Sequence, residues 1–193
     1  MNNQKEKTNS SKKILDTAFY CLSTKGYANV SMRDIANEAG VALSQLNYHY
    51  KNKEGLFTEV IKVMIFRYIS EIERKLETTT KIEEKLTSLV EYFKNLIKKK
   101  PDFFKLFVDF SAQSLWSPIF AEQLKNLFDD LAEMIEKNIL TGVVSNKKAP
   151  KYSAKTIARF VLGALYGISV QIMLDSDEEN AYKSLNMVEN ILV

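Results

Sequence analysis

The spacing of apolar residues constrains the fold of this chain more than any other feature of the sequence. Along nearly all of it, apolar side chains recur every three to four residues, and no segment of useful length alternates as a strand does. The 193 residues include only six Gly and three Pro, too few turn-forming residues for an all-β fold. We therefore predict an all-α protein of about nine helices.

The counts of Cys and His limit the chemistry of the chain, because there is one of each, Cys21 and His49. A disulfide needs two cysteines, and a zinc site usually takes three or four Cys and His ligands. No cluster of carboxylates stands out that could replace His in acid–base catalysis. We therefore expect no enzymatic activity, no cofactor and no metal site. Cys21 is interpreted as a small buried residue in a reducing compartment, with a reactive thiol as the alternative.

Two segments bear on where the protein is located. The start, Met1 to Lys13, is polar and lacks the apolar stretch of a secretory signal. The longest uncharged run, Phe160 to Leu174, has fifteen residues, fewer than the roughly 20 of a membrane-spanning helix. We therefore predict a cytoplasmic protein without a membrane partner, in which this run is a helix buried on all sides by protein.

The positive charge is concentrated near the N-terminus. Residues 1–53 carry eight basic and four acidic side chains, whereas the remainder carries 19 basic and 20 acidic ones. A basic segment attached to a nearly neutral body favours an acidic polymer or an anionic surface as its partner. A basic face exposed to solvent, without a partner, is the alternative that charge alone leaves open.

The segment from Val30 to Phe57 predicts a helix-turn-helix. Ser31 can cap a short helix that ends at Gly40, and a second short helix follows from about Ala42 to Tyr48. Residues of suitable size for the junction between them are Ile35, Ala36, Ala39, Val41 and Leu46. The side chains then expected to face outward on the second helix, which fits a DNA major groove, are Leu43, Ser44, Gln45 and Asn47. Groups suited to phosphate surround it: Ser31, Tyr48, His49, Lys51 and Lys53.

Residues 35–57 resemble the N-terminal domain of the TetR family of bacterial regulators. The resemblance rests on three stretches, Ile35-Ala36, Glu38 to Val41 and Leu46 to Glu54, and covers roughly residues 10–57. It implies a homodimeric DNA-binding regulator with a three-helix DNA-binding domain, joined by a long fourth helix to a C-terminal helical domain that binds a ligand and dimerises.

By position, the resemblance also implies roles for individual residues. Base contacts are expected from Arg33, Leu43, Ser44, Gln45 and Asn47, and phosphate contacts from Ser31, Tyr48, His49 and Lys53. The sequence departs from the family in three places. Ala42 stands where Ser or Thr often caps the recognition helix, Leu43 where a polar residue is common, and Asn47 where Tyr is frequent.

We divide the chain into a DNA-binding domain, residues 1–53 with a flexible tail over 1–9, and an effector-binding and dimerisation domain, residues 54–193. The stripe from Lys53 to Glu77 predicts a helix of about six turns that links them. The stretch from Val143 to Ser153 is the best candidate for a loop in the second half.

The C-terminal domain is rich in aromatic residues between Ile82 and Ile139, which predicts a pocket for a small hydrophobic effector. Ordinary core packing is the alternative for each residue. The candidate lining consists of Tyr92, Phe103, Phe104, Phe107, Asp109, Phe110, Gln113, Trp116 and Phe120. In this set Asp109 is a possible counter-charge for a cationic ligand.

The last two helices are predicted to form the homodimer. Gly163, Ala164 and Gly167 permit close helix approach, and pairing across a two-fold axis would give a four-helix bundle. Two recognition helices related by that axis would fit a palindromic operator on double-stranded DNA. The main prediction is a repressor released from its operator by a ligand; the alternative is a regulator that answers to a protein partner or to no effector.

Overall fold

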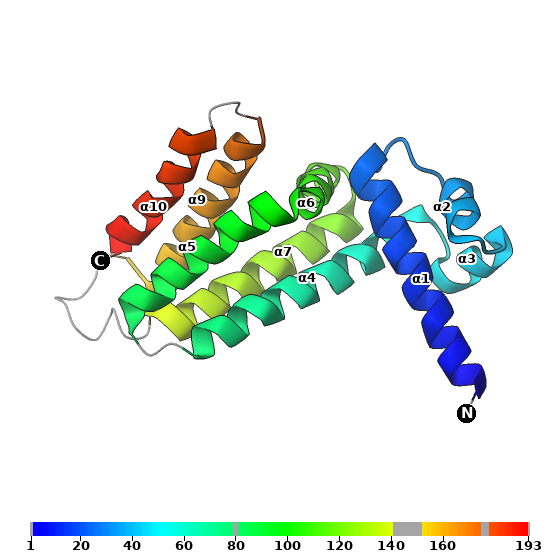
Figure 1. The fold of residues 1–193 in the computed structure, drawn as a ribbon, viewed down its shortest axis with the longest axis horizontal. Coiled ribbons are helices and arrows are strands. Elements are labelled where there is room, and N and C mark those ends of the chain that lie inside the picture. The colour runs from blue at the N-terminus through cyan, green and yellow to red at the C-terminus, as the bar shows by residue number, and fades with distance from the viewer. Residues whose placement is uncertain (1, 79–80, 141–151, 175–177, 193) are drawn as a thin grey trace. The chain divides into compact units, whose positions relative to one another are not determined.

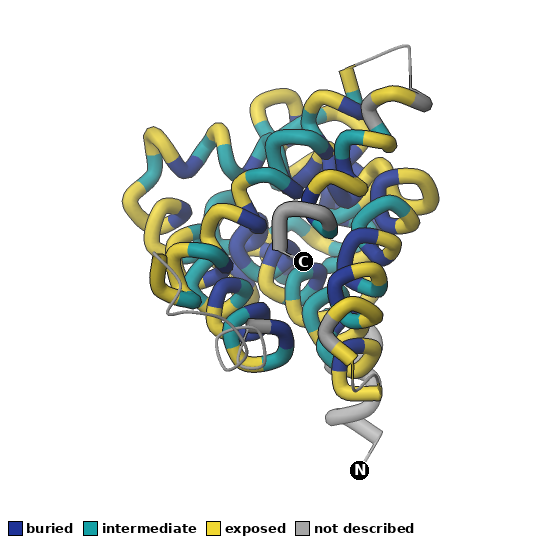
Figure 2. Tube along the Cα trace, turned by 90° about the vertical axis from the view of Figure 1, so that its left-hand side faces the viewer, coloured by how far each residue is buried: buried dark blue, intermediate teal, exposed yellow. Residues whose placement is uncertain are grey.

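The computed structural model describes residues 2–78, 81–140, 152–174 and 178–192, and within these residues the chain forms nine α-helices and one π-helical segment (Figure 1). The all-α prediction is thus confirmed. The predicted loop between Val143 and Ser153 lies almost wholly outside the described residues. Buried and exposed positions alternate along the helices with helical spacing (Figure 2).

The helices divide between two compact units, and both α4 and α7 contribute to each. The first unit comprises residues up to Phe66 together with Asp102–Gln123, and the second comprises Arg67–Pro101 together with the residues from Leu124 onward. This division by packing falls within α4, whereas the functional boundary predicted at residue 53 remains a prediction.

The first unit contains α1 (Asn2–Lys25), α2 (Met32–Ala39), α3 (Leu43–Tyr50), the first half of α4 (Lys53–Glu77), α6 (Pro101–Gln113) and the start of α7 (Pro118–Ile135). Helix α1 begins at Asn2 and so includes most of the stretch over residues 1–9 that was predicted to be a tail. Its buried stripe includes Ile14, Ala18 and Leu22, each at most 1% exposed.

An aromatic cluster forms the centre of the first unit. Phe57 of α4 stacks on Tyr27, with ring centroids 4.8 Å apart, and meets Phe110 and Phe120 edge-on at 5.7 and 5.3 Å. Phe57, Phe110 and Phe120 are each at most 1% exposed. The first turns of α7 and the middle of α6 are therefore packed against the connection between α1 and α2.

The second unit contains the end of α4, α5 (Ile82–Lys99), the rest of α7, the π-helical segment η1 (Glu136–Leu140), α9 (Ala154–Leu174) and α10 (Glu178–Leu192). Helices α5, α9 and α10 pack against one another. The side chains buried among them include Leu86, Leu89 and Val90 of α5, Val161 and Leu165 of α9, and Leu185 and Val188 of α10. The Lys85 ammonium donates a hydrogen bond of 2.9 Å to the carbonyl of Asn138 in η1.

Helix α9 is not covered on all sides by its own chain, which corrects the prediction for the run from Phe160 to Leu174. Phe160 is 56% exposed and Leu174 is 84% exposed. A Cβ added at Gly163 or Gly167 would meet no atom within 4 Å. Among the described residues, one helix, α9, is long and apolar enough to span a membrane by length and composition alone. A third of its most apolar stretch is buried.

Candidate nucleic-acid interface

The predicted helix-turn-helix is present in the first unit, where α2 packs on both α1 and α3. Ile35, Ala39 and Leu46 are completely buried at the junction. The tight turn depends on Gly40, which has φ 63° and ψ 40°, a left-handed conformation that residues with a Cβ rarely adopt. Val41, predicted to be part of the same core, is only half-buried.

Helix α2 begins with a complete capping box. The Ser31 hydroxyl oxygen accepts a hydrogen bond from the Asp34 amide at 3.2 Å, and the Ser31 amide donates to the Asp34 carboxylate at 2.8 Å. The Ser31 hydroxyl also donates to that carboxylate at 2.6 Å. These hydrogen bonds hold the pKa of Asp34 below its ordinary value. Ser31 therefore has a capping role, and its predicted phosphate contact remains a prediction.

Helix α3 has one buried and one open side. Leu46 and Tyr50 anchor it, and the Tyr50 hydroxyl lies 3.0 Å from the hydroxyl of Ser11 on α1. On the opposite side Ser44 and Tyr48 are exposed, Tyr48 by 82%. The other exposed polar side chains at this surface are Arg33, Asn47, His49 and Lys51.

Two of the predicted base-contacting residues are less open than expected. Leu43 and Gln45 are half-buried. Leu43 lies on the edge of the buried side because it is three residues before Leu46, nearly one helical turn. The N-cap of α3 is Ala42, and no side chain caps this end.

The turn between α3 and α4 has an unusual conformation. Lys51 has φ 62° and ψ −56°, and the Asn52 amide donates to the Tyr50 carbonyl at 2.7 Å. These features define a classic γ-turn, which is rare and strained. Asn52 then caps α4, because its side-chain oxygen accepts from the Gly55 amide at 2.8 Å. A Cβ at Gly55 would lie 2.4 Å from the Tyr50 carbonyl oxygen, so only glycine fits this close approach.

Lys53, a predicted phosphate contact, is half-buried at the first turn of α4. Its ammonium lies 4.2 Å above the centre of the Tyr27 ring, a cation–π contact. Burial lowers the pKa of Lys53, while Asp109 and Asp34 oppose that change. The side chain thus has an intramolecular partner as well as the charge needed for a phosphate.

Asp109, predicted as a counter-charge for a ligand, holds the connection between α1 and α2, and its role toward a ligand remains a prediction. Its carboxylate accepts a hydrogen bond from the Tyr27 amide at 2.5 Å and another from the Gln113 side chain at 3.3 Å. Glu54 at the start of α4 accepts a hydrogen bond from the Ser117 hydroxyl. Both carboxylates therefore connect the region around α6 to the helix-turn-helix within the first unit.

The other residues predicted to line an effector pocket have different environments. Phe103, Phe104 and Phe107 are buried, and Phe103 stacks on Phe107 with centroids 6.2 Å apart. Phe110 and Phe120 belong to the aromatic core already described. Trp116 differs most from the prediction, since it is 86% exposed in the turn after α6.

Tyr92 belongs to the second unit, where its hydroxyl donates to the Tyr68 carbonyl at 2.9 Å. The Lys75 ammonium lies 5.3 Å from the centre of the Tyr92 ring. Burial, with a smaller contribution from Glu71, raises the pKa of the phenol. Among the described residues there is no group of three or more His, Cys, Asp or Glu placed to hold a metal ion. Cys21 is buried, and burial raises its thiol pKa.

Sequence reasoning missed three structural residues of this surface: Tyr27, Asn52 and Gly55. Asn52 before a helix start is a recognisable cap signal. The role of Tyr27 depends on contacts with segments distant in sequence, and that of Gly55 on a rare turn. Spacing along the sequence reveals neither.

Comparison with known proteins agrees with this geometry. Residues 14–60 match the family model described as bacterial regulatory proteins, tetR family. Over 138 residues the chain is 26% identical to an uncharacterized helix-turn-helix-type transcriptional regulator of Haemophilus influenzae, a match that spans 68% of this chain and 65% of that protein. Other curated relatives are matched over 37% to 45% of their lengths.

Solved structures share the fold over nearly the whole chain. A TetR transcription regulator from Haloarcula marismortui has a TM-score of 0.82 at 18% identity, with 95% of this chain and 96% of the other covered. The transcriptional regulator FadR from Bacillus subtilis, in complex with stearoyl-CoA, has a TM-score of 0.81 at 16% identity, with 95% and 97% covered.

Fold and surface together define a helix-turn-helix protein of the DNA-binding class. Residues 14–60 form a DNA-binding domain of the tetR family of bacterial regulatory proteins, and the whole chain shares the fold of regulators of that family. The family is one of regulators and not of enzymes.

Proposed function

We propose that the protein binds a palindromic operator on double-stranded DNA, with α3 in the major groove, and that it represses transcription. The observation that carries this proposal is the open side of α3: Leu46 and Tyr50 are the buried residues of the helix, and its polar side chains are exposed except for the half-buried Gln45. A helix presented in this way fits the major groove, where base edges display a readable pattern of donors and acceptors.

Roles for the surface residues follow from their positions. The residues proposed to contact base edges are Arg33, Ser44, Gln45 and Asn47. Leu43 is proposed to contact a thymine methyl group at the edge of the protein–DNA interface. Phosphates are assigned to Ser31, Tyr48, His49, Lys51 and Lys53. Because DNA is the partner, we place the protein in the cytoplasm.

Selection of bound fragments from a genomic pool, followed by gel shift, tests the DNA proposal. Gln45→Ala should change which sequence is preferred, whereas Lys51→Ala should weaken all sequences alike and lower the slope of log affinity against log salt by about one. Lys99→Ala, an exposed lysine of α5, is the matched control and should change neither. Binding that is as weak for every selected sequence as for random DNA would contradict the proposal.

A second copy of the chain is proposed to cover the exposed face of α9. One side of the helix carries four residues at intervals of three, four and seven positions: Phe160, Gly163, Gly167 and Leu174. Met187 of α10 is 60% exposed as well. An apolar face with room at two glycines permits close packing with its copy across a two-fold axis.

Gly163→Leu tests the dimer with little risk to the monomer, since a Cβ at this position meets nothing in its own chain. Sedimentation should show the parent protein as a dimer and the variant as a monomer with unchanged helix content. Glu133→Leu, which places a leucine on the exposed side of α7, should remain a dimer. A parent protein that is monomeric at micromolar concentration would exclude this arrangement.

A hydrophobic small molecule is proposed as the effector that releases the operator. The support for this is the stearoyl-CoA bound by the Bacillus subtilis regulator of the same fold, and the buried aromatic residues of α6 are the candidate contacts. Such a ligand would act by stabilising a conformation with lower affinity for DNA. Compounds extracted from the purified protein, identified by mass spectrometry and added to the gel shift, test the idea. If no compound releases the DNA, regulation by a protein partner or without an effector becomes the better proposal.

A further inference from the structure

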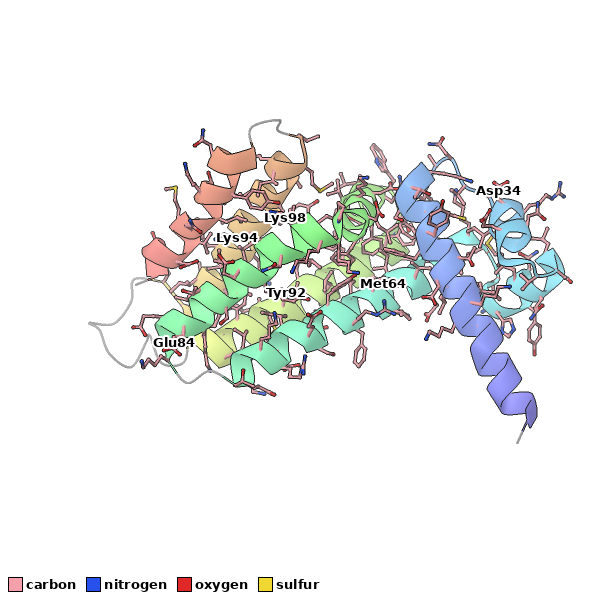
Figure 3. All side chains as sticks on the ribbon, viewed as in Figure 1. Asp34, Met64, Glu84, Tyr92, Lys94 and Lys98 are labelled. Atoms are coloured by element: carbon pink, nitrogen blue, oxygen red, sulfur yellow. The ribbon has the colours of Figure 1, made fainter. Side chains whose placement is uncertain are left out.

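The second unit carries an open groove between α5 and α10, with a volume of about 440 Å³. Three lysines line it: Lys94 and Lys98 from α5 and Lys183 from α10. Figure 3 shows Lys94 and Lys98 along α5. The groove holds one carboxylate, Glu91, so positive charge predominates.

The lysines of α5 differ in their surroundings. Lys94 forms an ion pair with Glu91, and only 19% of the Lys94 side chain is exposed, against 52% for Glu91. Lys98 follows four residues later, and residues at this interval are neighbours on one face of a helix. Lys98 is exposed and, within the described part of the chain, has no ion-pair partner. At least one cation in the groove is therefore not neutralised by the protein.

The remaining polar groups in the groove are uncharged. Asn95 and Asn186 supply amides that both donate and accept hydrogen bonds, and Tyr182 supplies a phenol. The volume falls in the range of about 300–1,000 Å³ that is usual for small-molecule sites. A ligand that fits all these groups has a multiply charged anionic part and a neutral polar part.

We propose that this groove binds a small phosphate-bearing ligand of the nucleotide class, with its phosphates on the lysines and its nucleoside near the asparagines and Tyr182. Ammonium groups from two helices suit several phosphate charges, whereas a single carboxylate would engage one of them. The site lies wholly in the second unit and uses none of the residues assigned to DNA. It therefore does not depend on the proposed function.

Calorimetry on the full chain tests the proposal with ATP, inorganic triphosphate and adenosine as probes. We expect ATP to bind more tightly than triphosphate, and adenosine to bind least. Lys98→Ala and Lys183→Ala should each weaken ATP binding by about tenfold, because each removes a charge-assisted contact. Binding of ATP and triphosphate with equal affinity would overturn the assignment of the nucleoside part.

Two lysine variants locate the bound ATP. Lys99→Ala, next to Lys98 but outside the groove, should leave the ATP affinity unchanged. Lys51→Ala, in the basic surface around α3, should also leave it unchanged. If Lys51→Ala weakens ATP binding while Lys98→Ala does not, the anion is bound by the DNA-binding surface and the groove proposal is wrong. Operator binding by Lys98→Ala should match the parent protein, which separates this test from that of the proposed function.

Discussion

Helices α2 and α3 have the same length, eight residues, but their ends are stabilised in opposite ways. Helix α2 has a capping box at its start and a left-handed glycine at its end. Helix α3 starts at Ala42 without a side-chain cap and ends in a strained turn at Lys51.

This difference shows which helix can form from local signals. Caps satisfy the orphan amides and carbonyls of α2 within its own sequence, whereas α3 must be held by tertiary contacts. Those contacts are Leu46, Tyr50 and the close approach of Gly55. The helix that meets the partner is therefore the one whose stability depends most on its neighbours.

Leu46→Ala should have the largest effect, because it removes the buried anchor of α3. We expect a loss of about 2–5 kcal/mol in the free energy of unfolding. Urea unfolding followed by circular dichroism measures it. Leu43→Ala, at a half-buried leucine of the same helix, should cost clearly less; equal losses would show that α3 does not depend on Leu46.

Gly55→Ala should have the second-largest effect. We expect it to lower the free energy of unfolding by about 1–3 kcal/mol, because the added Cβ overpacks the turn. The atom in the way is a backbone oxygen, so the turn itself must shift and DNA binding should weaken with stability. Gel shift and urea unfolding measure the two effects. An unchanged affinity would mean that the γ-turn at Lys51 does not position α3.

Ser31→Ala removes the cap of α2 and should cost about 1 kcal/mol. The interaction with Ser31 holds the pKa of Asp34 below its ordinary value. Its stabilisation is therefore present above the unfolded-state pKa and is lost as the pH falls through the folded-state pKa. The difference between the parent and the variant should therefore be largest at neutral pH and should shrink in acid to the part that comes from the Asp34 amide donating to the Ser31 hydroxyl, which does not titrate. Unfolding at several pH values measures it, and a difference that grows as the pH falls would contradict the role of the Asp34 carboxylate.

Ala42→Ser should have the smallest effect and the opposite sign. It supplies the missing cap of α3 and should stabilise the protein by about 0.5–1 kcal/mol. Asn37→Ser, at an exposed position inside α2, offers no uncapped amide to its hydroxyl and should change little. A gain no larger than in this control would mean that the start of α3 already has a partner.

The sequence predicted the fold class and the helix-turn-helix because both depend on local signals. Apolar spacing located Ile35, Ala39 and Leu46, and Ser31 as a candidate cap marked the start of α2. The exposed polar residues of α3 could be predicted because the helix has only eight residues. Once the buried residues of such a short helix are identified, the remaining positions must lie on the opposite, open side.

Residues whose roles depend on distant contacts could not be predicted. Asp109 was assigned to a ligand because a lone acid among aromatic residues has no visible partner in sequence, yet it binds the amide of Tyr27, 82 positions away. The aromatic residues of α6 could be predicted to face an apolar environment. Their spacing does not show whether that environment is the wall of a ligand pocket or the core that contains Phe110 and Phe120. The groove between α5 and α10 requires two helices far apart in sequence and was not foreseen.

Trp116 gives the protein a built-in optical probe. It is the sole tryptophan of the chain, and its ring is surrounded by solvent at the turn between α6 and α7. Its fluorescence should therefore be red-shifted and open to quenching by iodide in the native protein. A blue shift on adding a compound or DNA would report that this turn, one residue from the Ser117 contact to α4, has become covered, without any label.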